Sequence, residues 1–364
     1  MSVRTYKFVL HPSERQRALL DTLQLFCSYV SNAYMYITTK YSKSNDKNMK
    51  NSEVNDLLNA IKTKYSSFSS LSTDIVHAVG KEVIKAPHQH TPITFIPLKK
   101  TSIKNEFVSI GYHTFIPYKQ TRPLPESPNS ISNVQIKKQG QNWFVYCYIY
   151  QPTTSVNPRN LHKFVGIDVG LKEFAILSNG TRIPNPRYYR TMEHKIKMEQ
   201  QKLNNKIKNS KRWSAQKERL GRLHQKIHNQ RKDFIHKTAN DIIKNFDVIG
   251  VESLSIQKMN RNRKFSKSIL DASWGDFIST LKYKAEDQGK ALVEVDRFYP
   301  SSQLCSVCGS KQIMPLKLRL FKCNTCSAII ERDYNASLNI EREAKNKFLE
   351  QYVFGEQNLN DMGG

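Results

Sequence analysis

The segment Lys163-Phe-Val-Gly-Ile-Asp-Val-Gly170 decides the fold of the second half of this chain. It is a nearly continuous apolar run, which is typical of a buried strand, and Asp168 interrupts it. A carboxylate inside an apolar strand is costly unless something binds it. The segment therefore predicts a buried strand that carries a functional acid close to its end.

Strands and helices alternate after this segment. The run Phe174 to Leu177 follows a tight turn and forms a hairpin, whose polar end is Ser178-Asn-Gly180. A hairpin followed by strands that alternate with helices predicts a ribonuclease-H-like mixed sheet of the α/β class. The elements expected after the hairpin are helix 186–245, strand 248–252, helix 271–288, strand 291–295 and helix 333–347.

The first half of the chain is predicted to be a β-domain with a helical insertion. A strand is expected from Val3 to Leu10, after which apolar residues recur at helical spacing within residues 11–86. From Thr91 to Tyr150 the period changes to two, which indicates a small barrel or sheet. The opening strand is expected to pair with this sheet, so the helical block would be inserted into a β-domain.

Three acids stand where reactive groups collect. Asp168 and Glu252 each follow a buried run, and Asp333 begins the last predicted helix. Reactive groups of an α/β sheet gather at strand ends, so the two strand carboxylates converge if their strands are parallel neighbours. Asp333 then closes the set. Any one of these acids alone is more often a helix cap or half of a surface ion pair, but the three together favour a functional site.

The clustered acids predict a metal site. They repel one another and raise one another's pKa, which two divalent ions about 4 Å apart relieve. Such ions clamp the attacking and leaving oxygens of a phosphodiester. Hard oxygen ligands favour Mg²⁺ or Mn²⁺. The pattern therefore predicts a metal-dependent nuclease.

Four cysteines in two Cys-x-x-Cys pairs predict a zinc site. The pairs are Cys305 with Cys308 and Cys323 with Cys326. Two such thiolate turns complete a closed tetrahedral site, so the zinc would be structural rather than catalytic. The alternative of two redox motifs is disfavoured because neither pair opens a thioredoxin-like unit. The two other cysteines, Cys27 and Cys147, lie in apolar patterns and are expected in the core.

The net charge points to a polyanionic partner. Fifty-seven Lys and Arg against thirty-one Asp and Glu give a formal charge of +26 over 364 residues. A membrane partner is disfavoured, because no apolar run is long enough to cross a bilayer and the first residues lack the apolar core of a secretion signal. Cysteines in close pairs, rather than in a disulfide framework, indicate an intracellular compartment.

The predicted helix 186–245 carries many cations. A solvated face is the alternative for any single residue, yet the cations together exceed what solubility needs and favour phosphate binding. Segment 260–267 is expected to be a mobile loop beside the active site and a candidate lid over a single DNA strand. Its candidate nucleic-acid-binding residues are Arg261, Arg263 and Lys264. The candidate nucleic-acid-binding residues of the helix are Lys211, Arg212, Lys217, Arg219, Arg222, Lys226, Arg231 and Lys232.

Six motifs in one order carry a family resemblance. They are Gly166-Ile-Asp-Val-Gly-Leu-Lys-Glu-Phe-Ala175, Asn229-Gln-Arg-Lys-Asp-Phe-Ile-His-Lys237, Val251-Glu-Ser-Leu254, Ala272-Ser-Trp-Gly-Asp-Phe277, Val295-Asp-Arg-Phe-Tyr-Pro-Ser-Ser-Gln-Leu-Cys-Ser-Val-Cys-Gly309 and Glu331-Arg-Asp-Tyr-Asn-Ala-Ser-Leu-Asn-Ile340. With these motifs the chain resembles TnpB, the transposon-encoded family regarded as ancestral to the miniature type V CRISPR effectors. It is similar also to the eukaryotic and viral relative Fanzor. The resemblance is dense over residues 161–345 and extends to the first half only in layout.

The resemblance implies an RNA-guided DNA endonuclease. A guide RNA would pair with the target strand next to a short flanking motif, and a single RuvC site would cleave the DNA. Asp168, Glu252 and Asp333 fall on the family's catalytic positions. The implied cofactors are Mg²⁺ or Mn²⁺, Zn²⁺ and the guide RNA. The implied partners are double-stranded DNA and the RNA–DNA heteroduplex. The protein would bind them as a monomer or as a dimer on one RNA. The implied location is the cytoplasm or nucleoid of a prokaryote, or the nucleus of a eukaryotic host.

The resemblance also implies a domain order. A β-barrel wedge domain would comprise residues 1–10 and 87–160 and contain a helical recognition domain at 11–86. A RuvC domain at 161–300 and 327–347 would hold a zinc-binding target-strand module at 301–330, followed by a flexible tail at 348–364. Thr73, His77 and Lys81 would share one helix face of the recognition domain and read flanking DNA. A polar face that only meets water is the alternative for that helix.

Two other functions fit parts of the sequence. A guide-independent RuvC-like nuclease or transposase would need neither the wedge layout nor the inserted helices of the first half. A non-cleaving RNA-guided DNA-binding protein would not need three intact acids. Both are therefore disfavoured.

Overall fold

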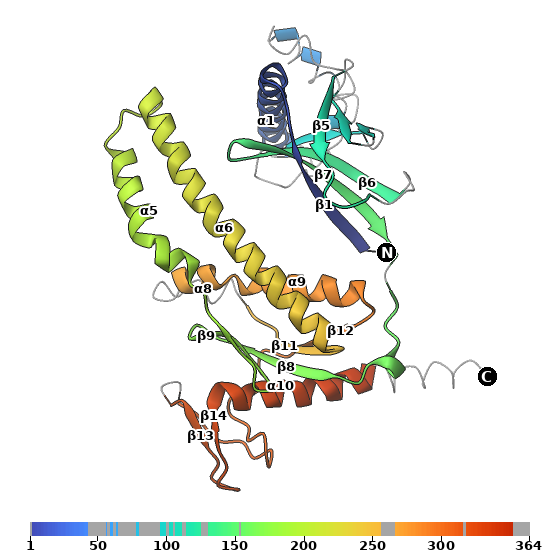
Figure 1. Ribbon diagram of the computed structural model, residues 1–364, viewed down its shortest axis with the longest axis vertical. Coiled ribbons are helices and arrows are strands. Elements are labelled where there is room, and N and C mark those ends of the chain that lie inside the picture. The colour runs from blue at the N-terminus through green and yellow to red at the C-terminus, as the bar shows by residue number, and fades with distance from the viewer. Residues whose placement is uncertain are drawn as a thin grey trace, which may run out of the picture. The chain divides into compact units, whose positions relative to one another are not determined.

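The computed structural model contains two compact units, Met1–Pro152 and Thr153–Gly364 (Figure 1). It describes residues 2–42, 95–99, 102–104, 106–110, 114–124, 130–152, 154–255, 266–315 and 318–351, with short pieces at 56, 59–60, 63–64 and 78–79. Each unit has its own sheet and its own hydrophobic core.

The first unit is built on a seven-stranded sheet in the order β2-β6-β7-β1-β5-β4-β3, an open half-barrel. Strand β1 pairs antiparallel with β7 from Ser2 opposite Gln151 to Val9 opposite Phe144. The prediction that the opening strand joins the later sheet is therefore confirmed. The strands are β1 (Ser2–Leu10), β2 (Phe95–Leu98), β3 (Ile103–Lys104), β4 (Phe107–Ser109), β5 (Phe115–Lys119), β6 (Ile131–Gln139) and β7 (Asn142–Gln151).

Alternation along the strands places one face of this sheet in the core. In β7, Trp143, Val145 and Cys147 are buried, whereas the residues between them are half-buried. Helix α1 (Glu14–Ser42) packs on this core and contributes Cys27 to it. Both cysteines are buried, as predicted, and burial raises the pKa of each thiol to about 12. Neither thiol is therefore a nucleophile at neutral pH.

The second unit contains a five-stranded sheet in the order β10-β9-β8-β11-β12. Strands β8, β9 and β10 are antiparallel neighbours, whereas β11 runs parallel to both β8 and β12. The predicted hairpin and the two later strands are present. Strand β10 was not predicted, because three residues are too short to display a period. The strands are β8 (Phe164–Val169), β9 (Glu173–Leu177), β10 (Arg182–Pro184), β11 (Val248–Glu252) and β12 (Ala291–Val295).

Helices cover both faces of this sheet (Figure 1). Helix α10 (Arg332–Leu349) packs on one face, and α6 (Lys211–Asn245) and α9 (Trp274–Asp287) pack on the other. Helix α5 (Tyr188–Asn204) contacts both α6 and α8 (Ser266–Ala272). Within the described residues, no helix has the length and apolar character needed to cross a lipid bilayer.

Two predicted helices are each divided in the structure. The stretch 186–245 is interrupted by a connection in which Asn209 has a φ of 66° and Ser210 caps α6 by accepting from the Trp213 N–H at 3.1 Å. The stretch 271–288 is divided at Ser273, which has a φ of 54° and separates α8 from α9. Left-handed backbone ends a helix, and apolar periodicity alone does not reveal it at a residue other than glycine.

Helix α10 crosses the sheet over two glycines that lie opposite each other, Gly166 of β8 and Gly250 of β11. A Cβ at Gly166 would lie 2.1 Å from the Ser337 carbonyl oxygen and 2.4 Å from the Glu341 backbone nitrogen. A Cβ at Gly250 would lie 2.5 Å from the Ala344 Cβ. The missing side chains therefore let the helix approach the strands closely.

We expect Gly166→Ala to lower the free energy of unfolding by about 3 kcal/mol or more, because the added methyl group meets backbone atoms that cannot rotate away. Urea denaturation measures the loss. Gly221→Ala in α6 is the matched control: nothing lies within 4 Å of its added Cβ, and the helix should gain up to about 1 kcal/mol. An unchanged stability of Gly166→Ala would contradict the close contact of α10 with the sheet.

Candidate functional site

Strand β8 directs Asp168 toward the α10 side of the sheet. Val165 and Ile167 belong to the core under α6 and α9, whereas Gly166 lies beneath α10. Because side chains alternate along a strand, Asp168 projects on the same side as Gly166. The acid thus follows the glycine at which the helix crosses the sheet.

Strand β11 repeats this arrangement. Gly250 lies beneath α10, and Glu252 follows it on the same face. The two strands are parallel, and Val251 lies opposite Ile167. Asp168 and Glu252 therefore emerge side by side at the carboxyl edge of the sheet.

The third acid, Asp333, lies in the first turn of α10, and two arginines hold its carboxylate. Arg332 donates from Nε and Nη2 to Oδ1 at 2.9 and 2.8 Å, and Arg319 donates from Nη1 to Oδ2 at 3.2 Å. Arg319 lies between the two cysteine pairs, in the segment 301–330 that we call the cysteine module. This module therefore contacts the acid directly. Sequence reasoning identified neither arginine. The only sequence signal for such a contact is that Arg332 directly precedes Asp333, and Arg319 has no signal of this kind.

Negative charges from the other two acids act on Asp168. Burial raises the pKa of Asp168 well above its usual range, and the charges of Glu252 and Asp333 raise it further, whereas Arg332 lowers it. Burial also raises the pKa of Glu252, and a hydrogen bond from Ser301 Oγ at 2.6 Å opposes that shift. The three carboxylates are thus coupled electrostatically. A cation bound among them would relieve their repulsion.

We expect Asp168→Asn to raise the melting temperature of the protein without Mg²⁺ or Mn²⁺. An acid whose pKa is raised by folding contributes stability that is present below its unfolded pKa and is lost as pH rises through the folded pKa, so the Asp168 carboxyl group costs stability at pH values above its unfolded pKa. Each kcal/mol regained should add roughly 2–4 °C in a unit of this size.

Thermal melting at pH 7 in buffer without Mg²⁺ or Mn²⁺ and without chelator, which leaves the cysteine site intact, measures this effect. Asp233→Asn is the control, because the Asp233 carboxylate is exposed and pairs with Lys237 on the surface of α6. Its melting temperature should stay close to that of the wild type. A lower melting temperature for Asp168→Asn than for wild type would contradict this expectation, because it would show that the Asp168 carboxyl group stabilises the fold.

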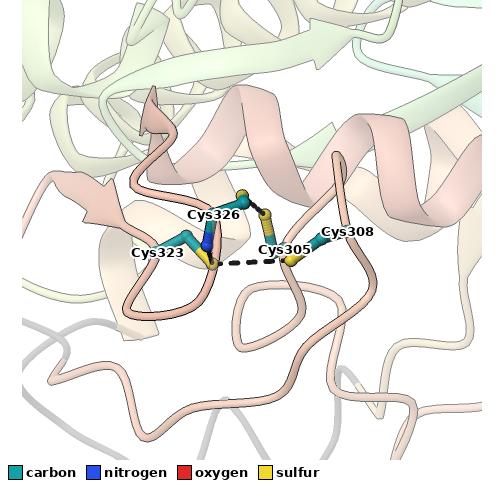
Figure 2. A group of neighbouring side chains, drawn as sticks. All are labelled: Cys305, Cys308, Cys323 and Cys326. Atoms are coloured by element: carbon teal, nitrogen blue, oxygen red, sulfur yellow. Dashed lines mark hydrogen bonds between the residues drawn. The ribbon is translucent and has the colours of Figure 1, made fainter.

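The four cysteine side chains converge at the two turns of their module (Figure 2). Their Sγ atoms all lie within 4.8 Å of one another, and within the described residues no other group of acids, histidines or cysteines meets this criterion. Two sulfur–sulfur distances, between Cys305 and Cys326 and between Cys308 and Cys323, are 3.6 Å. Tetrahedral zinc with Zn–S bonds of about 2.3 Å needs sulfurs about 3.8 Å apart. The donor set therefore fits a closed zinc site.

The surroundings of Cys323 favour its thiolate. The Ser310 hydroxyl at 3.2 Å and the backbone N–H groups of Cys326 and Thr325 at 3.4 Å lower the Cys323 pKa to about 5. A thiolate is the form that binds zinc. The short strands β13 (Leu320–Lys322) and β14 (Ile329–Glu331) form an antiparallel pair that leads into and out of the second turn.

Two buried asparagines of α10 connect the cysteine module to the edge of the sheet that carries Asp168 and Glu252, which we call the acidic edge. Asn335 donates to the Leu304 carbonyl at 2.6 Å, and Asn339 donates to the carbonyls of Ser301 and Leu304 at 2.8 and 2.7 Å. Ser301 in turn donates to Glu252. A run of direct hydrogen bonds therefore connects α10, the module and one strand acid. No spacing or motif in the sequence predicts this role for the asparagines.

Most of the predicted phosphate-binding residues of α6 are exposed and form a basic surface along the helix. Lys217 lies 5.0 Å from the centre of the Trp213 ring, and Arg222 pairs with Glu218 at 3.5 Å. The exposed residues are Lys211, Arg212, Lys217, Arg219, Arg222, Lys226 and Lys232. The other predicted contacts, Thr73, His77, Lys81, Arg261, Arg263 and Lys264, lie outside the described residues.

Arg231, the eighth predicted phosphate-binding residue of α6, is only partly exposed and has an acidic partner. Its guanidinium donates from Nε and Nη2 to Asp271 Oδ1 at 3.0 and 2.7 Å. The buried Asp271 carboxylate also accepts from the backbone nitrogen of Tyr189 at 2.9 Å. Arg231 therefore joins α6 to α5 and α8 through an ion pair. Helix periodicity could not reveal this partner, because Asp271 comes from a different helix.

Two family models match consecutive parts of the chain. Residues 145–263 match the OrfB family of IS605, described as "Probable transposase". Residues 274–340, which contain the four cysteines and Asp333, match the Cas12f1-like TNB domain. Over residues 145–263 and 274–340 the chain is therefore similar to the TnpB/OrfB family. Asp168 and Glu252 fall within the first match.

Curated TnpB relatives are similar over part of their length. A Streptomyces pristinaespiralis protein named "Putative RNA-guided DNA endonuclease" is 32% identical over 221 residues, which are 60% of this chain and 54% of the relative. "TnpB-like protein L770" of Acanthamoeba polyphaga mimivirus is 25% identical over 237 residues, which are 61% of this chain and 44% of the relative. The chain spans about half the length of the curated relatives it matches.

Solved structures of miniature CRISPR nucleases are also similar to this chain. The mini-RNA-guided endonuclease CRISPR-Cas_phi3 has a TM-score of 0.49 at 10% identity, and the match covers 94% of this chain and 92% of that one. The Cas12f1-sgRNA-target DNA complex gives a TM-score of 0.37 at 15% identity, with 94% and 99% covered.

Proposed function

We propose that this chain is an RNA-guided DNA endonuclease whose reaction centre is formed by Asp168, Glu252 and Asp333. The shared position of these acids carries the proposal: two leave adjacent parallel strands on the α10 side, and the third lies in the first turn of α10. The raised pKa of Asp168, caused by burial and then by the other two carboxylates, supports the same grouping. Similarity to bacterial proteins named putative RNA-guided DNA endonucleases supports the guided reaction.

The acids suit Mg²⁺ or Mn²⁺ as cofactor. Their donor atoms are hard oxygens, and their mutual repulsion is the penalty that a divalent cation offsets. Bound cations of this kind lower the pKa of the attacking water and neutralise charge on the phosphate. The chain itself orients the ligands, because Ser301 holds one Glu252 oxygen and Arg332 holds Asp333. Arg319 is more than half exposed beside Asp333, so its guanidinium is accessible to a substrate phosphate.

The proposed domain architecture follows the same logic. Residues 161–300 and 327–347 would form a ribonuclease-H-like RuvC domain, whose antiparallel hairpins and central parallel strands supply the acidic edge. Residues 301–330 would form the zinc-bearing target-strand module. Residues 1–10 and 87–160 would form the wedge domain around recognition helices at 11–86, and residues 348–364 the tail.

Guide RNA and the heteroduplex are the proposed polyanionic partners. The exposed cations of α6 suit phosphate contacts, which release counterions and make binding fall as salt rises. Base pairing would read the sequence, so the protein needs only backbone contacts to the heteroduplex and a reader of the short flanking motif. This division accounts for a basic surface along α6 that carries few acids.

Sequencing the RNA that copurifies with the full chain tests the proposal, followed by cleavage assays on DNA matched to that RNA. A discrete RNA with a variable 3′ end, and Mg²⁺-dependent cleavage of matched DNA only, are the expected results. Cleavage that ignores the match would identify a guide-independent nuclease. RNA-directed binding without cleavage would identify a guided DNA-binding protein.

A further inference from the structure

A short loop carries an aromatic side chain into solvent next to the acidic edge. Phe298, in the loop that follows β12, is 81% exposed, although phenylalanine is usually buried. Strand β12 lies parallel to β11, and its last residue, Val295, is opposite Glu252. The loop therefore begins beside one of the acids assigned to the reaction centre.

The backbone around Phe298 is fixed by its own hydrogen bonds. Its N–H donates to Asp296 Oδ1 at 2.7 Å, and the Tyr299 N–H donates to the Asp296 carbonyl at 3.0 Å. These bonds form a turn in which an aspartate side chain caps its own loop. The turn therefore fixes the backbone from which the exposed ring projects.

The loop is also anchored on both of its neighbours. Tyr299 packs on the core under α10 and donates from its hydroxyl to the Asn339 carbonyl at 3.3 Å. Ser301 closes the loop, since its Oγ donates to Glu252 Oε1 at 2.6 Å and its carbonyl accepts from Asn339 Nδ2 at 2.8 Å. A loop held this firmly has no structural need for an exposed phenyl ring.

An exposed arginine accompanies the ring. The Arg297 guanidinium lies 5.2 Å from the centre of the Phe298 ring, and Arg297 itself is exposed. A cation next to a free aromatic face is the combination with which proteins bind unpaired nucleic acid: the ring stacks on a base, and the cation contacts a phosphate.

We propose that Arg297 and Phe298 form a stacking site for one base of single-stranded DNA next to the three acids. The proposal rests on the proposed function, since the strand to be cut is the DNA that must reach Asp168, Glu252 and Asp333. A base can stack on Phe298 only after it has left the duplex, so the site selects unpaired strand. Stacking there would hold the adjoining backbone at the acidic edge.

Fluorescence of 2-aminopurine in single-stranded DNA tests the site. A set of oligonucleotides with the analogue at successive positions is titrated with the full chain carrying Asp168→Ala, so that nothing is cleaved. Stacking on Phe298 quenches the analogue at one position. Adding Phe298→Ala should abolish that quenching and weaken binding roughly tenfold, as loss of one stacked base does. Phe298→Trp should keep both.

Two further variants separate the parts of the site. Arg297→Ala should reduce the slope of log affinity against log salt by about one phosphate contact while some quenching remains. Ile207→Ala, which removes an apolar side chain that is 84% exposed in the connection between α5 and α6, is the matched control and should change neither readout. Because Phe298 is exposed, its truncation should leave the melting temperature and zinc content unchanged.

Undiminished quenching and affinity in Phe298→Ala would overturn the proposal. So would quenching that appears only with an RNA oligonucleotide of the same sequence, because the site would then take RNA. These results are distinguishable from failure of the proposed function. Asp168→Ala protein that cleaves like wild type would refute the reaction centre, whereas the stacking comparison needs no cleavage.

Discussion

Alanine at Asp168, Glu252 or Asp333 is expected to abolish DNA cleavage while leaving RNA and DNA binding nearly intact. Metal-bound carboxylates act on the charge that develops during phosphodiester hydrolysis, and their loss removes several kcal/mol of transition-state stabilisation. At about 1.4 kcal/mol for each tenfold change in rate, a loss of roughly 4 kcal/mol lowers the rate about 1,000-fold. Binding rests on the cations of α6 and on base pairing, which these substitutions do not touch.

Single-turnover cleavage of matched DNA and gel-shift binding of the same DNA measure the two effects. Asp233→Ala is the control acid, because its exposed carboxylate pairs with Lys237 on α6, away from the sheet. It should cleave like wild type. A variant at any of the three positions that retained about a tenth of the wild-type rate would remove that residue from the reaction centre.

The strand acids could be found from the sequence because each interrupts or ends a buried run. The structure adds how α10 approaches them: Gly166 and Gly250 admit the helix close to the sheet, and the two acids follow two residues later on the same side. Alternation with a period of two was therefore enough to place Asp168 and Glu252 once the strands were known to be parallel neighbours.

Side chains that act through contacts between distant segments could not be predicted in this way. Arg319 reaches Asp333 from the cysteine module, and Ser301 reaches Glu252 from the loop after β12. Neither pair has a sequence spacing that a helix or strand period could reveal. The ion pair of Arg231 with Asp271 could not be predicted for the same reason, and its role in phosphate binding stays a prediction.

Replacing Cys305 by serine or Cys323 by alanine is expected to remove zinc and unfold the cysteine module. Two pairs of thiolates place all four sulfurs within 4.8 Å, and free apposed thiolates repel one another unless a cation binds them. Structural zinc contributes roughly 10–16 kcal/mol of apparent binding free energy in small domains, so loss of one ligand costs the module its order. Since Arg319 belongs to that module, its contact with Asp333 should be lost as well, and cleavage should fall while guide RNA remains bound.

Elemental analysis and thiol titration of the purified chain test this prediction. Wild type should contain one zinc per chain, and the Cys305 and Cys323 variants none. Cys147→Ala is the matched control, because this buried cysteine lies in the core of the first unit; it should lower the melting temperature and leave the zinc content unchanged. Wild-type protein with four reduced thiols in the module and no zinc would contradict the assignment. In that case the bonds from Asn335 and Asn339, rather than a metal ion, would have to hold the module against α10.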